Sequence, residues 1–567
     1  MDIKFCFLHS MNKEKRVFVF LCLIPLVLFL AIFDYKILNP NYLDWFQEDT
    51  YQHWLGWSFF RETSFLQFPI LKNYAFGMDS AGSLIYSDSI PIIALLLRPF
   101  SDLLDFHFQY FGWWIALCVF LQYMTAFKIM NLVSSNNIFN FIASCFFIFS
   151  PVFLFRYNIG HESLMGQWLV LIGLYFYLRP KRVPDNYWLI LILGSLLVHG
   201  YFFAMISIIY FVVLLRRYYK DSEDIKKILL NLFRLISYSL ILMYIVGYFT
   251  IEDVFHGGYG GYRLNILSIF NPYGSAFGVE SLLPRFSLFK ATKNIGDFEG
   301  FNYLGFGMLM MLSILLINGI INFKYKNFVE KLRDNSFTII LISIITLYAL
   351  SNRIAFGPYE LFQYNVPEIF KLFTSPFRAS GRMFWPAYYI IYILILFQIF
   401  KRFQINYAIS IVIIALSLTV YDIKDHVLLA NASKGIKISK IEKNNFKDLR
   451  WKKLGNQYTT INYVFPVYAP NNWQTISYFA AKNKLNINGG YWARHNEIAE
   501  NRYAEEIKIR IKNNTYDKNA IYYFNDTKYW NLAKDKNKSK SDLIEEIDNL
   551  RILAPDFFKN DENEHKK

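Results

Sequence analysis

Apolar runs long enough to form membrane-spanning helices recur through the first 421 residues of the chain. The core of a bilayer, about 30 Å thick, takes roughly 20 apolar residues of helix, and fewer where a helix is packed inside protein. The stretch 187–217 is long for one span, so its polar break at His199-Gly200 predicts two short helices joined by a tight turn. The sequence therefore predicts about eleven spans, at residues 17–33, 107–131, 138–155, 163–178, 187–200, 202–217, 228–249, 301–322, 336–351, 383–400 and 404–421.

Composition favours a membrane protein over a nucleic-acid-binding one. Of the 567 residues, 54% are hydrophobic and 18% are charged, whereas a soluble protein carries about a quarter charged residues. The net charge of +15 is not concentrated on one segment, because the basic residues stand in short clusters between apolar runs. A nucleic-acid-binding protein needs a concentrated basic surface, so we expect membrane lipids, and no nucleic acid, as partners.

The short basic clusters also predict the orientation of the spans. Cytoplasmic loops of membrane proteins carry an excess of Lys and Arg. If the N-terminus lies in the cytoplasm, every short basic cluster falls on the cytoplasmic side and the long loops fall outside. The clusters lie at residues 179–182, 216–227, 324–333 and 401–402, and the long outer loops at 34–106, 250–300 and 352–382.

The region after the last span has a different pattern. Short apolar runs (461–468 and 520–524) alternate with helix-like stretches (473–484 and 498–512), which is typical of a small α/β domain. The predicted fold is therefore mainly α, a polytopic transmembrane protein with a small extracytoplasmic α/β domain. The predicted domains are residues 1–421, with the first outer loop 34–106, and residues 422–567.

The first outer loop contains the sequence QEDTYQHWLGW, in which Glu48 and Asp49 are adjacent and His53 follows Asp49 at a spacing of four. On a helix, Asp49 and His53 would share one face. Such a pair can act as a base and its orienting partner, or can bind a divalent cation. Alternatively, Asp49 caps an interfacial helix whose tryptophans lie at headgroup level. Tryptophans beside carboxylates, such as Trp57, also suit sugar rings.

Further ionisable side chains stand at the predicted outer ends of the spans. Such groups at membrane depth are costly and usually face a cavity or a partner. Individually, Arg156 and Arg382 can reach lipid headgroups, His199 can be an ordinary buried histidine, and Glu299 can cap the next helix. Their convergence on one side instead predicts a site, whose members are Asp88, Arg156, His161, Glu162, His199, Glu299, Arg378 and Arg382.

Several segments resemble one family of bacterial membrane proteins, which we place in the GT-C glycosyltransferase superfamily. The resemblance covers most of the chain, from the first span through the C-terminal domain. The segments that carry it are QEDTYQHWLGWSFFRE, YSDSIP, QYFGWW, RYNIGHESLMGQW, FEGFNYLGFG and SPFRASGRMFWPAYY.

The resemblance implies a sugar transferase of the bacterial cytoplasmic (inner) membrane. The sugar would pass, with inversion, from a polyprenyl-phosphate carrier to a cell-envelope glycan or lipid acceptor on the outer face. Asp49, with Glu48 beside it, would be the general base. Arg378 and Arg382, with Arg156 behind them, would stabilise the phosphate leaving group.

The resemblance also suggests a divalent cation, Mg²⁺ or Mn²⁺, bound in part by acids of the first outer loop, with Glu48, Asp49 and His53 as the candidate ligands. The substrate-binding set would be completed by Asp88, His161, Glu162, His199, Glu299 and Trp57. Two alternatives remain open: a flippase or transporter of lipid-linked saccharides, and a non-catalytic envelope scaffold. The few charges in the middle of the predicted spans weigh against a transporter.

Overall fold

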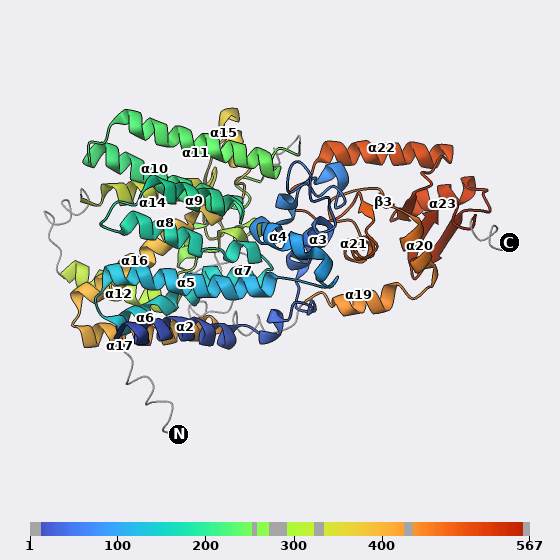
Figure 1. The fold of residues 1–567 in the computed structure, drawn as a ribbon. Helices are drawn as coiled ribbons and strands as arrows, with labels where there is room; N and C mark the ends of the chain where they lie inside the picture. Colours follow the sequence, from blue (N-terminus) through green and yellow to red (C-terminus); the bar gives the residue numbers. More distant parts are fainter. Residues whose placement is uncertain (1–12, 252–257, 271–291, 322–333, 425–434, 560–567) are drawn as a thin grey trace, which may run out of the picture. The chain divides into compact units, whose positions relative to one another are not determined.

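The computed structural model describes residues 13–251, 258–270, 292–321, 334–424 and 435–559. The predicted basic cluster 324–333 and parts of the predicted outer loop 250–300 lie outside these residues. The described chain is mainly helical with a small C-terminal sheet, as predicted (Figure 1). It divides into two compact units: unit 1 comprises residues 1–38, 111–236 and 255–433, and unit 2 comprises residues 39–110, 237–254 and 434–567.

Helices occupy most of each of the eleven apolar segments. They are α2 (Lys13–Ile32), α5 (Phe111–Val133), α6 (Asn137–Ile148) with α7 (Pro151–Asn158), α8 (Trp168–Leu178), α9 (Asp185–Leu196), α10 (Gly200–Lys220), α11 (Ile225–Val246), α12 (Phe306–Ile321), α14 (Ser336–Leu350), α16 (Trp385–Arg402) and α17 (Ile405–Asp422). Within the described residues, six helical stretches are long and apolar enough to cross a membrane: Phe111–Val133, Asn137–Asn158, Gly200–Lys220, Ile225–Val246, Ser380–Arg402 and Ile405–Asp422. Several such helices are compatible with a membrane protein.

The predicted break at His199-Gly200 separates α9 from α10. His199 occupies the N-cap position of α10, and its Nδ1 accepts a hydrogen bond of 3.2 Å from the backbone N–H of Tyr201. A side-chain acceptor at this position satisfies one of the free N–H groups at a helix start. The imidazole therefore has a structural role at the break that the sequence indicated.

The C-terminal part of unit 2 holds a five-stranded sheet of order β4-β3-β5-β7-β6. Its strands are β3 (Thr460–Val464), β4 (Asn486–Ile487), β5 (Ala520–Phe524), β6 (Leu543–Ile547) and β7 (Leu550–Ala554). β4 and β5 both pair in parallel with β3, whereas β7 runs antiparallel to β5 and β6 antiparallel to β7. The accompanying helices are α19 (Ile438–Asn445), α20 (Arg450–Gln457), α21 (Trp473–Lys482), α22 (Glu497–Asn513) and α23 (Thr527–Lys536).

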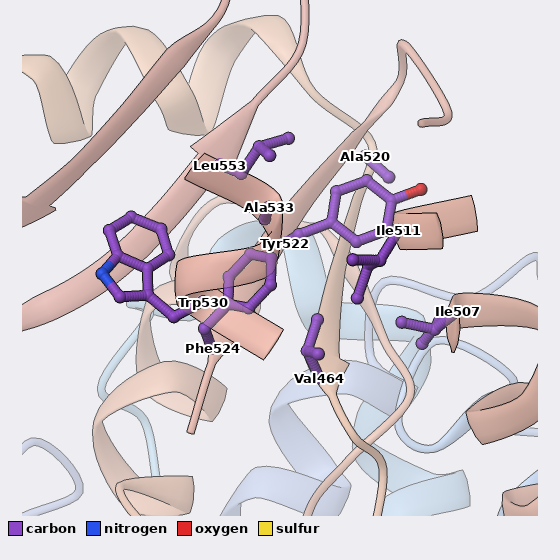
Figure 2. Packing of buried hydrophobic residues seen from close by; sticks show 9 residues of the cluster. All are labelled: Val464, Ile507, Ile511, Ala520, Tyr522, Phe524, Trp530, Ala533 and Leu553. Carbon is purple, nitrogen blue, oxygen red and sulfur yellow. The ribbon is translucent and has the colours of Figure 1, made fainter. Parts of the chain in front are cut away.

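Two helices bury apolar side chains against one part of this sheet (Figure 2). All five residues of β5 are buried, as expected for a strand in the interior of a sheet. Around it, Ile507 and Ile511 come from α22, and Trp530 and Ala533 come from α23. The cluster is completed by Val464, Ala520, Tyr522, Phe524 and Leu553.

The first outer loop, from residue 39 onward, belongs to the same compact unit as this sheet. Ile487 of β4 donates its N–H to the carbonyl of Ala75 at 2.9 Å, and its own carbonyl accepts from Gly77 N–H at 2.8 Å. Residues 75–77 therefore lie along the β4 edge like a further strand. The loop also contributes α3 (Glu48–Phe60), whose residues from Thr50 to Phe60 are all buried.

Candidate functional site

A buried cluster in unit 1 joins two arginines to one glutamate. Arg156 lies on α7, Glu299 on the short helix η8 (Ile295–Gly300), and Arg382 on η9 (Ser380–Phe384). Arg156 Nη1 donates to Glu299 Oε2 at 2.6 Å, and Arg382 Nε donates to the same oxygen at 2.7 Å. Arg382 Nη2 also donates to Oε1, so this guanidinium binds the carboxylate with two nitrogens. These contacts correct two alternatives: neither arginine extends to headgroups, and Glu299 does not cap α12.

Aromatic rings line the two guanidinium groups. The guanidinium of Arg156 lies 5.1 Å from the ring centroid of Trp385, and that of Arg382 lies 5.0 Å from the ring centroid of Tyr201. Ring faces attract cations, and the attraction grows when the pair is desolvated. Arg156 Nη1 also lies 3.4 Å from Nδ1 of His161. The predicted His161 therefore joins the same cluster.

Glu299 is ionised in this environment. Burial by itself would raise the pKa of its carboxyl, but the positive charges of Arg382 and Arg156 outweigh burial and hold the pKa well below the ordinary 4.5. The two guanidinium groups and the one carboxylate together carry one net positive charge. Such a group of charges can attract an anion such as a phosphate.

Arg378 lies four residues before Arg382 and is half-buried. Its guanidinium is 5.7 Å from the ring centroid of Tyr262. Among the residues that the structure describes, Arg378 has no carboxylate within ion-pair distance. Of the three arginines in the predicted site, Arg378 is therefore the one that can bind an anionic ligand without first breaking an ion pair with a carboxylate of the described residues.

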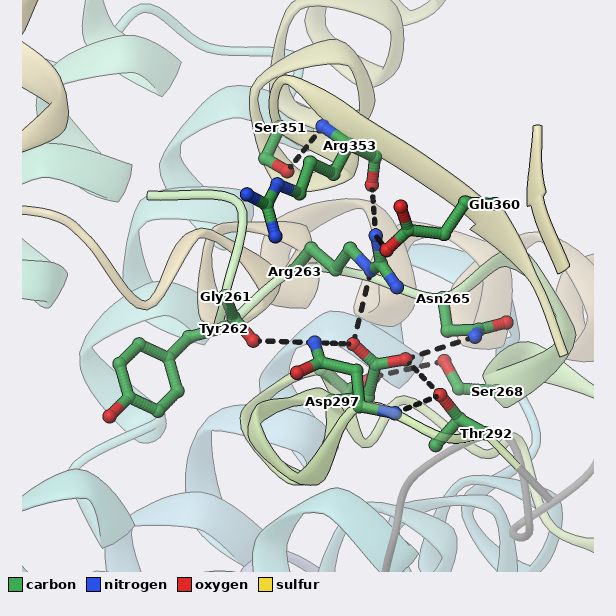
Figure 3. A network of polar contacts seen from close by, with 12 residues as sticks. Gly261, Tyr262, Arg263, Asn265, Ser268, Thr292, Asp297, Ser351, Arg353 and Glu360 are labelled. Atoms are coloured by element: carbon green, nitrogen blue, oxygen red, sulfur yellow. Dashed lines mark hydrogen bonds and ion pairs between the residues drawn. The ribbon is translucent and has the colours of Figure 1, made fainter. Parts of the chain in front are cut away.

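A second polar network in unit 1 fixes the segment that carries Glu299 (Figure 3). Asp297 is fully buried and accepts hydrogen bonds from Arg263 Nε at 3.1 Å, Asn265 Nδ2 at 3.1 Å, Thr292 Oγ1 at 2.6 Å and Asn294 Nδ2 at 2.6 Å. Asp297 and Arg263 were not among the residues predicted from the sequence. The available signal was a second acid two residues before Glu299, in the sequence IGDFEG.

Three backbone segments approach closely beside this network. A Cβ on Gly300 would lie 2.0 Å from the carbonyl oxygen of Arg263, and a Cβ on Gly381 would lie 2.4 Å from Cα of Gly300. Asn302 Nδ2 donates to the carbonyls of both glycines at 3.1 Å. Glycine is therefore required where the segments bearing Glu299 and Arg382 meet.

In unit 2, the predicted acid pair begins α3. Glu48 is exposed and Asp49 is half-buried, and both stand in the first turn, where the helix dipole favours negative charge. His53 and Trp57 lie further along the helix and are buried. The ring of Trp57 packs edge-on against Tyr110, with centroids 5.5 Å apart, so it does not offer the open face on which a sugar stacks. An interfacial helix with tryptophans at headgroup level is therefore wrong for α3.

Asp88 lies beside the packed surface of α3. It has a left-handed backbone with φ of 50°, which Asp tolerates better than most residues. The next residue, Ser89, donates its hydroxyl to the carbonyl of His53 at 2.7 Å.

Around Asp49 stand aromatic residues of the C-terminal domain that the sequence analysis did not single out. Burial, and next the negative charge of Asp49, raise the pKa of Tyr491 well above 10, with hydrogen bonds to Asp49 and Tyr468 adding to the shift. The Tyr491 ring is 5.3 Å from that of Tyr468 and 5.3 Å from that of Trp473. We call Asp49, Tyr468, Trp473 and Tyr491 the tyrosine platform.

The predicted residues thus fall into two sets. Unit 1 holds Arg156, His161, Glu162, His199, Glu299, Arg378 and Arg382, and unit 2 holds Glu48, Asp49, His53, Asp88 and Trp57. Glu162 is buried, and its carbonyl accepts a hydrogen bond of 2.7 Å from Trp114 Nε1.

The predicted metal ligands Glu48, Asp49 and His53 all lie on α3. No group of three or more His, Cys, Asp or Glu side chains that could hold a metal ion occurs among the described residues. Mg²⁺ is commonly held by one or two carboxylates together with substrate phosphates and water, so the cation that the resemblance implies stays a prediction.

In the part of the chain that the structure describes, six long apolar helices and a small C-terminal sheet form the architecture of a helical protein compatible with a multi-pass membrane location. The chain belongs to the family described as "Domain of unknown function (DUF6311)", which matches residues 22–424. The DUF6311 C-terminal domain matches residues 450–555. A comparison with curated proteins found no match. Function is therefore inferred from the site.

Proposed function

We propose that the protein is a membrane glycosyltransferase of the GT-C type. It moves a sugar from a polyprenyl-phosphate carrier to a cell-envelope glycan or lipid acceptor on the outer face of the bacterial cytoplasmic membrane. The observation that carries this proposal is the pairing of Arg156 and Arg382 with the single carboxylate of Glu299, with Arg378 in the same segment as Arg382. A surplus of arginine is the chemistry that a phosphate leaving group needs.

In the proposed reaction, a hydroxyl of the acceptor attacks the anomeric carbon of the donor sugar. The Asp49 carboxylate takes the hydroxyl proton as the new carbon–oxygen bond forms. The bond between the anomeric carbon and the phosphate oxygen breaks, and its electron pair leaves with the polyprenyl phosphate. Attack on the side opposite the leaving group inverts the anomeric configuration.

Two features of Asp49 support the role of base. It is half-buried and borders the aromatic rings of the tyrosine platform, so it is accessible at its surface and partly shielded from water. Asp49 is also held in a fixed place by the first turn of α3. The divalent cation stays a prediction, and no step of the reaction is routed through it.

We further propose the topology of about eleven spans, with the N-terminus in the cytoplasm and the C-terminal domain outside. Its support is that a helix occupies each of the eleven apolar segments and that the basic clusters fall between them on one side. In this orientation, the first outer loop and the C-terminal domain lie in the same compartment, outside the cytoplasm.

The test is the glycan composition of the cell envelope, measured by mass spectrometry in a deletion strain. The strain is complemented with wild type, Asp49→Asn or Asp102→Asn; Asp102 is an exposed acid of the same loop that serves as the matched control. Deletion should remove a sugar that wild type and Asp102→Asn restore and Asp49→Asn does not. Full restoration by a well-expressed Asp49→Asn would instead favour a transporter or a scaffold.

A further inference from the structure

The tyrosine platform lies at the edge of the sheet where α/β proteins usually bind ligands. Tyr468 follows the carboxyl end of β3, and Tyr491 follows the carboxyl end of β4, which is parallel to β3. From β3 the chain passes first to β4 on one side and then to β5 on the other. In open α/β sheets, ligands bind outside the carboxyl ends of the strands at such a change of direction.

The two loops of the platform are tied to each other and to α3. Ala469 N–H donates to the carbonyl of Gly490 at 2.9 Å, which connects the loop after β3 to the loop after β4. The hydroxyl of Tyr51, two residues after Asp49, donates to the carbonyl of Gln474 at 2.9 Å. Asp49 is therefore held against the sheet edge by neighbours on both elements.

Tyr468 presents part of its ring to solvent. The residue is 43% exposed, and its ring stacks on the imidazole of His495 with centroids 5.0 Å apart and planes at 25°. His495 Nδ1 lies 3.1 Å from Oε1 of Glu500, which orients the imidazole. An aromatic ring with a carboxylate and an imidazole nearby offers a surface for C–H groups together with acceptors for hydroxyl groups.

We propose that the tyrosine platform binds a pyranose ring of the acceptor glycan, with the apolar C–H face of the sugar against Tyr468 and a hydroxyl hydrogen-bonded to Asp49. This inference rests on the proposed function, because it assigns binding of the acceptor in that reaction to residues of the C-terminal domain. Tyr491 acts as a positioning residue, since it contacts the carboxylate that takes the proton. The C-terminal domain is then the part of the chain that selects the acceptor.

The experiment is saturation-transfer NMR on the full chain in detergent, with four probes: the methyl pyranosides of glucose, galactose, mannose and N-acetylglucosamine. At least one probe should show saturation concentrated on the ring C–H protons of one sugar face. Tyr468→Ala and Tyr468→Leu should weaken its binding by about tenfold, and Tyr468→Phe should retain it. Tyr74→Ala is the matched control, because Tyr74 is a tyrosine of the same unit with a similar exposure of 40%.

Three results would overturn the proposal: no probe binds, the Tyr468 variants bind as well as wild type, or Tyr74→Ala loses binding to the same extent. Failure of the proposed function would look different. In that case Asp49→Asn would still restore the envelope sugar, whatever the binding assay shows. With an active preparation, Tyr468→Ala should raise the acceptor concentration for half-maximal rate and leave the rate at saturation near that of wild type.

Discussion

A Cβ placed on Gly381 would lie only 2.4 Å from Cα of Gly300, so the backbones of the two segments that bear Arg382 and Glu299 are in direct contact. No side chain fits between them. The buried ion pairs of the cluster depend on this close approach, because it brings the two segments together from positions about eighty residues apart in the sequence.

The first prediction concerns that contact. Gly381→Ala should lower the free energy of unfolding by about 3 kcal/mol, since overpacking against backbone cannot be relieved by a rotamer change. The control is Gly194→Ala in α9, where a Cβ would meet no described atom within 4 Å. That variant should be neutral or stabilising by up to about 1 kcal/mol, because alanine favours helix over glycine. Thermal unfolding in detergent compares the two; equal melting temperatures would contradict the contact.

Glu299→Gln should destabilise the protein strongly. Removing the carboxylate leaves the buried Arg156 and the partly buried Arg382 without their shared anion, and breaking a buried ion pair costs about 3–5 kcal/mol. Glu368→Gln is the control, because Glu368 is 86% exposed and pairs with Lys371 one turn away. Its effect should stay within about 0.5 kcal/mol. A melting temperature for Glu299→Gln within about one degree of the control would show that the ion pairs of Glu299 with Arg156 and Arg382 do not stabilise the fold.

The same pair of proteins tests the pH dependence of the cluster. The folded-state pKa of Glu299 lies well below 4.5, its ordinary value, so its stabilising effect is present above that value and is lost as the pH falls through the folded-state pKa. The difference in melting temperature between wild type and Glu299→Gln should be constant from about pH 7 to about pH 5. It should shrink only in more acidic solution. A difference that already shrinks between these two values would mean that Glu299 is not held ionised by the arginines.

Arg378→Ala should reduce sugar transfer without reducing the stability of the protein. Because Arg378 is half-buried and has no carboxylate partner among the described residues, its loss should leave the melting temperature close to that of wild type. Sugar transfer should fall by about ten- to a hundredfold if the guanidinium binds the leaving phosphate, since a hydrogen bond to a charged group contributes about 1.5–3 kcal/mol. Arg378→Lys should recover part of the rate. Unchanged transfer in Arg378→Ala would remove this residue from the site.

Local patterns in the sequence were enough to predict the helices of the apolar segments, α21 and α22, whereas α19, α20 and α23 were not predicted. Each apolar run contains a helix, because apolar side chains along the whole length of a helix can be either buried or left exposed. The break at His199 is marked in the sequence by its polar residue alone. Of the five strands of the C-terminal sheet, β4, β6 and β7 were not predicted. In β6, Glu545 and Glu546 stand next to each other in the middle of the strand and interrupt the alternation of apolar and polar residues.

The predicted site was harder to derive, because its contacts are non-local. Polarity in an apolar context identified Arg156, Glu299 and Arg382, but not which of them would pair. Asp297 and Arg263 were missed because their pairing needs the fold to bring distant segments together. Trp57 was placed at a ligand surface on residue type alone, whereas its side of α3 is buried in unit 2.

We propose Asp49 as the base of a sugar transfer from a polyprenyl-phosphate carrier. The most direct measurement uses a lipid and glycan extract of the deletion strain, which should contain both the unused donor and the unmodified acceptor. Purified full-length wild type or Asp49→Asn is added, and mass spectrometry follows the sugar on the acceptor together with free polyprenyl phosphate. Wild type should release polyprenyl phosphate as the acceptor gains one sugar, and Asp49→Asn should do neither. Equal transfer by Asp49→Asn, or no transfer by correctly folded wild type, would contradict the proposal that Asp49 is the base of this sugar transfer.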